Sequence, residues 1–109
     1  MANPSKSKGD KYELEAARVL SELLSIPVRR KLGAGRLDDA GDLDGVTDLT
    51  IQVKAYNDLA RGVLAGLKDC PRNQANAGTA FGVSMVRIRG GRWAFVMTPE
   101  QFHDLYTNG

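Results

Sequence analysis

The segment from Thr47 to Ala55 alternates between polar and apolar side chains, and this alternation constrains the fold more than any other feature of the chain. Leu49, Ile51 and Val53 occupy alternate positions, and because successive side chains of a β-strand point to opposite faces, these three share one face. The polar positions are Asp48, Thr50, Gln52 and Lys54. The segment is therefore predicted to be a strand with one buried apolar face and one polar face.

Hydrophobic periodicity and turn residues predict seven further elements around this strand. They are a helix over 11–24, a strand over 28–32, an extended piece over 41–43, a helix over 59–67, strands over 80–88 and 92–97, and a helix over 98–106. Pro71 is expected to end the middle helix, although residues 72–78 could add one turn. Thr98-Pro99-Glu100-Gln101 has the pattern of a helix start with a capping box. The order α-β-β-β-α-β-β-α predicts an α/β or α+β sandwich, whose mixed central sheet of about five strands is flanked by helices.

The length of 109 residues, without a visible repeat or linker, indicates a single domain over 1–109. Residues 1–9 are polar and basic, so they are predicted to form a flexible N-terminal arm rather than a signal peptide. A single cysteine, Cys70, excludes an intrachain disulfide and a cysteine-rich zinc site. No apolar run reaches the roughly eighteen residues that a membrane span needs. We therefore expect a cytoplasmic protein of a bacterial or phage-infected cell.

The net charge of +2 conceals an uneven distribution. Five aspartates lie between positions 38 and 48, a stretch without lysine or arginine. The rest of the chain carries fifteen basic residues and eight acidic ones. A basic surface attracts nucleic-acid phosphate, and clustered carboxylates can hold a divalent cation. The distribution is that expected of a metal-using nucleic-acid enzyme, although an acidic loop on a mildly basic protein would look the same.

Asp42, Gln52 and Lys54 form the pattern most suggestive of chemistry. Gln52 and Lys54 share a strand face, and Asp42 precedes the tight-turn signal Asp44-Gly45, so its carboxylate can reach the same patch from a neighbouring strand. Mg²⁺ takes oxygen ligands and commonly one or two carboxylates. Lys54 would then orient a water molecule or offset charge on a phosphate.

The first helix supplies a further acidic candidate. Glu13 is spaced from Ala17 and Leu20 so that it lies at the edge of the buried stripe, whereas Glu15 aligns with Arg18 on the polar face. An acid on an inward edge is costly unless a metal or a cation compensates it. Glu13 is therefore the functional candidate, with a metal or Lys54 as its expected partner, and Glu15 is expected to be solvated.

Roughly the first sixty residues resemble, in motif order, the archaeal and phage Holliday junction resolvases of the PD-(D/E)xK nuclease superfamily. The matching features are Lys8-Gly9, Tyr12-Glu13, a basic strand, a Gly-rich loop, Gly41-Asp42-Leu43 and Gln52-Val53-Lys54. By this resemblance, Glu13 corresponds to the helix glutamate, Asp42 to the central metal aspartate, Gln52 to the second acidic ligand and Lys54 to the catalytic lysine. Arg29 or Arg30 would correspond to the DNA-contacting arginine.

The resemblance implies a restriction-endonuclease-like sandwich and an Mg²⁺- or Mn²⁺-dependent endonuclease that hydrolyses phosphodiester bonds in branched DNA. A homodimer is expected, because two sites related by a twofold axis match the near-twofold symmetry of a four-way junction. The residues expected to contact DNA are Lys6, Lys8, Lys11, Arg29, Arg30, Lys31 and Arg36.

Gln52 departs from the acidic residue that is usual in the superfamily, which removes one negative charge from the expected metal shell. Asp44 is the preferred reserve ligand, because Asp48 would lie about 13 Å from Gln52 along the strand, at ~3.3 Å per residue. Two alternatives stay open. One is a nickase or restriction-like nuclease of the same superfamily, and the other is a DNA-binding module that keeps the fold without catalysis.

Overall fold

The computed structural model describes residues 4–31 and 41–108, with side chains from Lys11 onward. Its elements are α1 (Pro4–Leu24), β1 (Arg29–Arg30), β2 (Leu43–Asp44), β3 (Leu49–Lys54), α2 (Leu59–Ala77), β4 (Phe81–Ile88), β5 (Arg92–Val96) and α3 (Pro99–Asn108). This order confirms the predicted one, and the class is α+β with a five-stranded mixed sheet and three helices.

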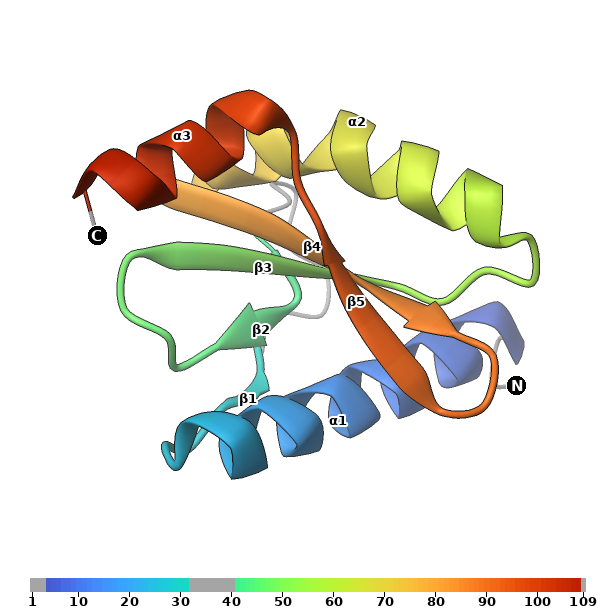
Figure 1. The fold of residues 1–109 in the computed structure, drawn as a ribbon. Coiled ribbons are helices and arrows are strands. Elements are labelled where there is room, and N and C mark those ends of the chain that lie inside the picture. Colours follow the sequence, from blue (N-terminus) through green and yellow to red (C-terminus); the bar gives the residue numbers. More distant parts are fainter. Residues whose placement is uncertain (1–3, 32–40, 109) are drawn as a thin grey trace.

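The strands follow one another across the sheet in the order β1-β2-β3-β4-β5. Only β3 and β4 run parallel, and their register pairs Lys54 with Val86. The other neighbours are antiparallel, and Leu43 of β2 lies opposite Ile51 of β3. Helix α2 makes the crossover between the two parallel strands. Figure 1 shows α1 on one side of the sheet and α2 and α3 on the other.

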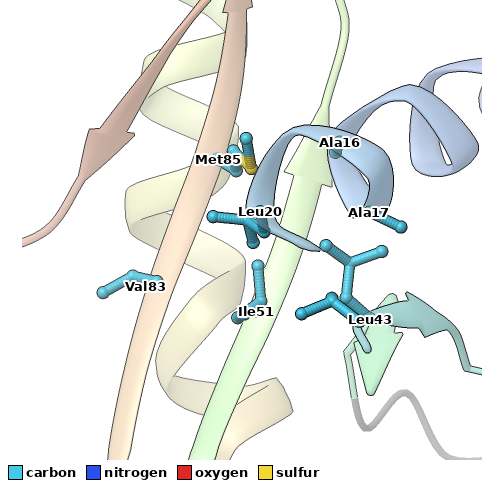
Figure 2. Packing of buried hydrophobic residues seen from close by; sticks show 8 residues of the cluster. Ala16, Ala17, Leu20, Leu43, Ile51, Val83 and Met85 are labelled. Carbon is cyan, nitrogen blue, oxygen red and sulfur yellow. The ribbon is translucent and has the colours of Figure 1, made fainter. Parts of the chain in front are cut away.

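The face of the sheet that α1 covers is apolar. Leu20 of α1 packs beside Ile51 of β3 and Met85 of β4, as Figure 2 shows. The other buried members of this cluster are Ala16, Ala17, Val28, Leu43 and Val83. The alternation predicted for β3 is confirmed, because Ile51 is buried in this cluster while Gln52 and Lys54 point to the α2 side. Small residues at positions 16 and 17 let α1 approach the sheet closely.

The face covered by α2 and α3 is more polar. The buried polar side chains of the described residues are Thr50, Gln52, Asn73, Ser84 and Gln101. Helix α2 approaches the sheet at Gly66, whose carbonyl accepts a 2.9 Å hydrogen bond from Ser84 Oγ. A Cβ atom added at Gly66 would lie only 2.8 Å from Ser84 Cβ. The glycine that weakens the helix in isolation therefore permits its contact with β4.

Helix α2 continues through Pro71, contrary to the prediction that it ends there. Proline removes one backbone donor from a helix interior, but buried residues on both sides of it hold the helix against the sheet. Its ends are well defined. The Asp58 side chain accepts from Arg61 N at the start, and Gly78 adopts a left-handed conformation, with φ of 71°, at the end.

The starts of α1 and α3 bear on two other predictions. Helix α1 begins at Pro4, so residues 4–9, predicted to belong to a flexible arm, are helical. The capping box of α3 is confirmed: Gln101 N donates to Thr98 Oγ1 over 3.1 Å, and Thr98 N donates to Gln101 Oε1 over 2.8 Å. None of the helices in the described ranges is long and apolar enough to cross a membrane.

Candidate active site

Asp42 lies directly beside the Gln52-Val53-Lys54 segment. Its Oδ2 atom accepts a 2.7 Å hydrogen bond from the backbone N–H of Val53. The Asp42 backbone is hydrogen-bonded to the chain on both sides. Asp42 N donates to Ile51 O of β3, and Asp42 O accepts from Lys31 N, which follows β1, each over 2.9 Å. The Asp42 carboxylate is thus fixed against the backbone of β3, and the Asp42 backbone lies between Lys31 and β3.

Gln52 and Lys54 face α2, where Lys54 has an acidic partner. Lys54 Nζ donates to Asp69 Oδ2 over 2.9 Å, and the lysine side chain is only 13% exposed. The hydrogen bond from Lys54 and the positive charge of that lysine lower the pKa of Asp69, although burial opposes them. Gln52 is buried, with 3% of its surface exposed.

Asp69 was not among the predicted site residues. The signal that could have found it is helical spacing, because Asp69 lies three residues after the buried Gly66 and four before the buried Asn73. That spacing is visible only if the helix is extended past Leu67. The expected stop at Pro71 placed Asp69 near a helix end instead of on a buried face.

Glu13 has a partner other than the one expected. Arg30 Nε of β1 lies 3.3 Å from Glu13 Oε1, and both side chains are partly buried. The expected compensation was a metal ion or Lys54, but Lys54 donates to Asp69, and Glu13 accepts from Arg30. Arg30, predicted as a DNA contact, therefore also neutralises an acid of the candidate site.

Glu15 is not solvated, so that expectation is wrong. Its Oε1 accepts from Arg87 Nε and from Trp93 Nε1, each over 3.0 Å. Its side chain is 19% exposed, against 23% for Glu13. Burial raises the pKa of Glu15, but the two hydrogen bonds and the charges of Arg87 and Arg18 bring it below its ordinary value. The two acids therefore flank the apolar stripe, with Glu13 toward β1 and Glu15 toward β4 and β5.

The remaining predicted residues surround this region on several elements. Asp44 of β2 is exposed and lies opposite the exposed Arg29 in the β1–β2 register. Lys31 is half-buried beside Asp42, and the exposed Lys11 lies with its Nζ atom 5.7 Å from the centre of the Tyr12 ring. The side chains of Lys6 and Lys8, and all of Arg36, lie outside the described part of the chain.

The oxygen ligands of the candidate site are those that a divalent metal ion prefers. Within the part of the chain with described side chains, no group of three or more His, Cys, Asp and Glu residues converges. Glu13, Asp42 and Gln52 supply the ligand types that Mg²⁺ takes, two carboxylates and an amide oxygen. Glu13 lies on α1, however, and Gln52 faces α2 on the other side of the sheet. Asp42 fits this role best, because it is partly exposed and fixed by the backbone of β3.

Comparison of the chain with protein-family models, with curated proteins and with solved structures finds no significant match.

Proposed function

We propose that the protein is a metal-dependent endonuclease of the restriction-endonuclease-like fold that hydrolyses phosphodiester bonds in four-way or otherwise branched DNA. The observation that carries the proposal is the hydrogen bond from Val53 N to Asp42 Oδ2, which joins the aspartate to the Gln-x-Lys strand. Further support comes from the element order and the mixed sheet.

Each residue of the candidate site has a role in this proposal. Asp42, with Glu13 and the amide oxygen of Gln52, would hold Mg²⁺ or Mn²⁺, which supplies an activated water and a Lewis acid when bound. The Lys54 ammonium group would offset the negative charge that builds on the phosphate. Asp69 would orient that ammonium group through the 2.9 Å hydrogen bond. Asp44 stays the reserve ligand.

Substrate binding would rest on the basic residues around β1 and the start of α1. Arg29 and Lys11 are exposed, so they can reach phosphates without losing a buried partner. A homodimer would present two such surfaces to two duplex arms. The exposed apolar side chains Leu23 of α1 and Phe95 of β5 are the candidate contacts between the two copies.

A second function, DNA binding without catalysis, is favoured by one feature of the site. Gln52 is buried, and both Glu13 and Lys54 are engaged by protein partners, Arg30 and Asp69. Such pairs can serve structure alone. A nickase or restriction-like nuclease would use the same site on a different DNA shape.

The proposal is tested by incubating the purified protein with a labelled four-way junction and a matched linear duplex. The reactions contain Mg²⁺ or Mn²⁺, and EDTA serves as the control. The nuclease proposal predicts metal-dependent paired nicks in the junction. Binding without cleavage in either metal supports the binding module, and nicking of the linear duplex at the same rate supports the nickase alternative.

A further inference from the structure

A cavity of about 270 Å³ opens at the carboxyl ends of the parallel strands β3 and β4, against the first half of α1. It is lined by Tyr12, Ala55, Tyr56, Asn57, Arg87, Ile88 and Arg89. This volume lies just below the range of small-molecule sites, about 300 to 1,000 Å³, so the cavity has room for one nucleotide at most and not for a duplex.

The lining side chains suit a nucleotide. Two arginines and two tyrosines are present, and no acidic side chain is among the described lining residues. Arg87 is held in place by Glu15, and its guanidinium carbon lies 4.7 Å from the centre of the Tyr12 ring. Arg89 is exposed in the turn between β4 and β5, where it can bind a phosphate group.

Tyr56 supplies a surface on which a base can stack. Its side chain is 44% exposed, while its Cβ and Cγ atoms lie against the backbone position of Gly62 in α2. The ring is therefore anchored at its base and open to solvent beyond it. Stacking of a nucleic-acid base on an aromatic ring contributes about 1–3 kcal/mol and needs no particular base sequence.

The cavity adjoins the candidate active site on two elements. Tyr12 precedes Glu13 on α1, and Ala55 follows Lys54 at the end of β3. A DNA strand bound at Asp42 and Lys54 could therefore continue along the protein surface to this cavity. Bases at a branch point are the easiest to take out of the stack, because extrusion costs least where pairing is already lost.

We propose that this cavity binds one unpaired nucleotide of a DNA strand, with the base stacked on Tyr56 and the phosphate held by Arg87 and Arg89. The use of the bound nucleotide in cleavage rests on the proposed function. The binding itself does not, so it is measured in EDTA, where no metal-dependent cleavage occurs.

The test is fluorescence anisotropy with a short single-stranded oligodeoxythymidylate and with an abasic strand of the same length. Tyr56→Ala is expected to weaken binding of the oligodeoxythymidylate roughly tenfold and to leave binding of the abasic strand unchanged. Tyr56→Phe keeps the ring and should bind as the wild type does. Arg89→Ala should weaken binding of both strands.

Arg72→Ala is the matched control, because Arg72 is an exposed arginine on the far half of α2 and does not line the cavity. Circular dichroism of each variant checks the fold, and Arg89→Ala, at an exposed position, serves if Tyr56→Ala unfolds. The proposal is overturned if Tyr56→Ala binds both strands as the wild type does, or if Arg72→Ala loses as much affinity as Arg89→Ala. If the Tyr56 and Arg89 variants bind as expected but the protein cuts no DNA, the nucleotide-binding role of the cavity stands and the nuclease proposal is rejected.

Discussion

Lys54 of β3 and Asp69 of α2 form an ion pair 2.9 Å long across the polar face of the sheet. Through this ion pair, helix α2, which is not part of the Asp42–Gln52–Lys54 pattern, contacts one residue of that pattern, Lys54. The Lys54 side chain is only 13% exposed, and the hydrogen bond to Asp69 fixes the position of its ammonium group.

Asp69→Asn should lower the free energy of unfolding by about 1 kcal/mol near neutral pH, because the variant loses a charge-assisted hydrogen bond. The pKa of Asp69 is lowered by folding, so its stabilising effect is present above the ordinary value of 3.8 and is lost as the pH falls below that value. Urea unfolding of both proteins across this range measures the difference. A gap that persists unchanged in acid would contradict the ion pair as its cause.

Gln52→Glu tests whether Gln52 faces the metal. The side chain is 3% exposed, so a carboxylate there should destabilise the metal-free protein. A divalent ion would offset that cost, so Mn²⁺ should raise the melting temperature of the variant more than that of the wild type. Thermal unfolding with and without Mn²⁺ measures both effects. If Mn²⁺ shifts the two proteins equally, Gln52 is not a ligand.

Substitutions of Glu13 and Glu15 in α1 should distinguish an effect on cleavage from an effect on stability. Glu13→Gln should strongly reduce junction cleavage, because Glu13 belongs to the proposed metal shell. Glu15→Gln should reduce cleavage far less than Glu13→Gln does but lower stability by roughly 1–3 kcal/mol, because Glu15 accepts from Arg87 and Trp93. Cleavage and urea unfolding are measured on the same preparations. The reverse pattern, with Glu15 essential for cleavage, would exchange the two roles.

Gly66 and Gly62 form a matched pair within α2. An alanine at 66 would bring its Cβ to 2.8 Å from Ser84 Cβ, whereas at 62 the nearest atom, Val86 Cγ1, is at 3.4 Å. Overpacking costs about 1–3 kcal/mol, and replacing a helical glycine by alanine gains up to about 1 kcal/mol. Gly66→Ala should therefore destabilise the protein, while Gly62→Ala should be neutral or stabilising. Equal effects in thermal unfolding would mean that α2 does not approach β4 as described.

Local patterns were enough to predict β3 and the start of α3. The alternation of Leu49, Ile51 and Val53 specifies one buried face, and Ile51 is buried as expected. The Thr98–Gln101 capping box depends on neighbours in sequence, and it is present. Such features are determined within a few residues, so no tertiary information is needed to find them.

Contacts between distant segments were beyond prediction from one sequence. Helix α2 continues through Pro71 because its buried face packs on the sheet, which outweighs the local cost of proline. Glu15 is held by Arg87 and Trp93, both more than seventy residues away in sequence. No periodicity in α1 signals those partners. The sequence pattern predicted that Asp42 lies beside the strand of Gln52 and Lys54, where it accepts from Val53 N, but it could not reveal that Asp69 engages Lys54 and Arg30 engages Glu13.

The most direct test of the central claim is junction cleavage by Asp42→Asn. Asparagine keeps an oxygen that can accept from Val53 N, so the fold should survive while the metal loses a carboxylate. Asp104→Asn, at an exposed position of α3, is the control. Labelled junction and linear duplex compete in one tube with Mg²⁺, and binding is measured separately in EDTA. We predict that the wild type and Asp104→Asn nick the junction in preference to the duplex, and that Asp42→Asn loses at least about a hundredfold in rate with little change in DNA affinity. Cleavage by Asp42→Asn at the wild-type rate would contradict the assignment of Asp42 and with it the proposed active site.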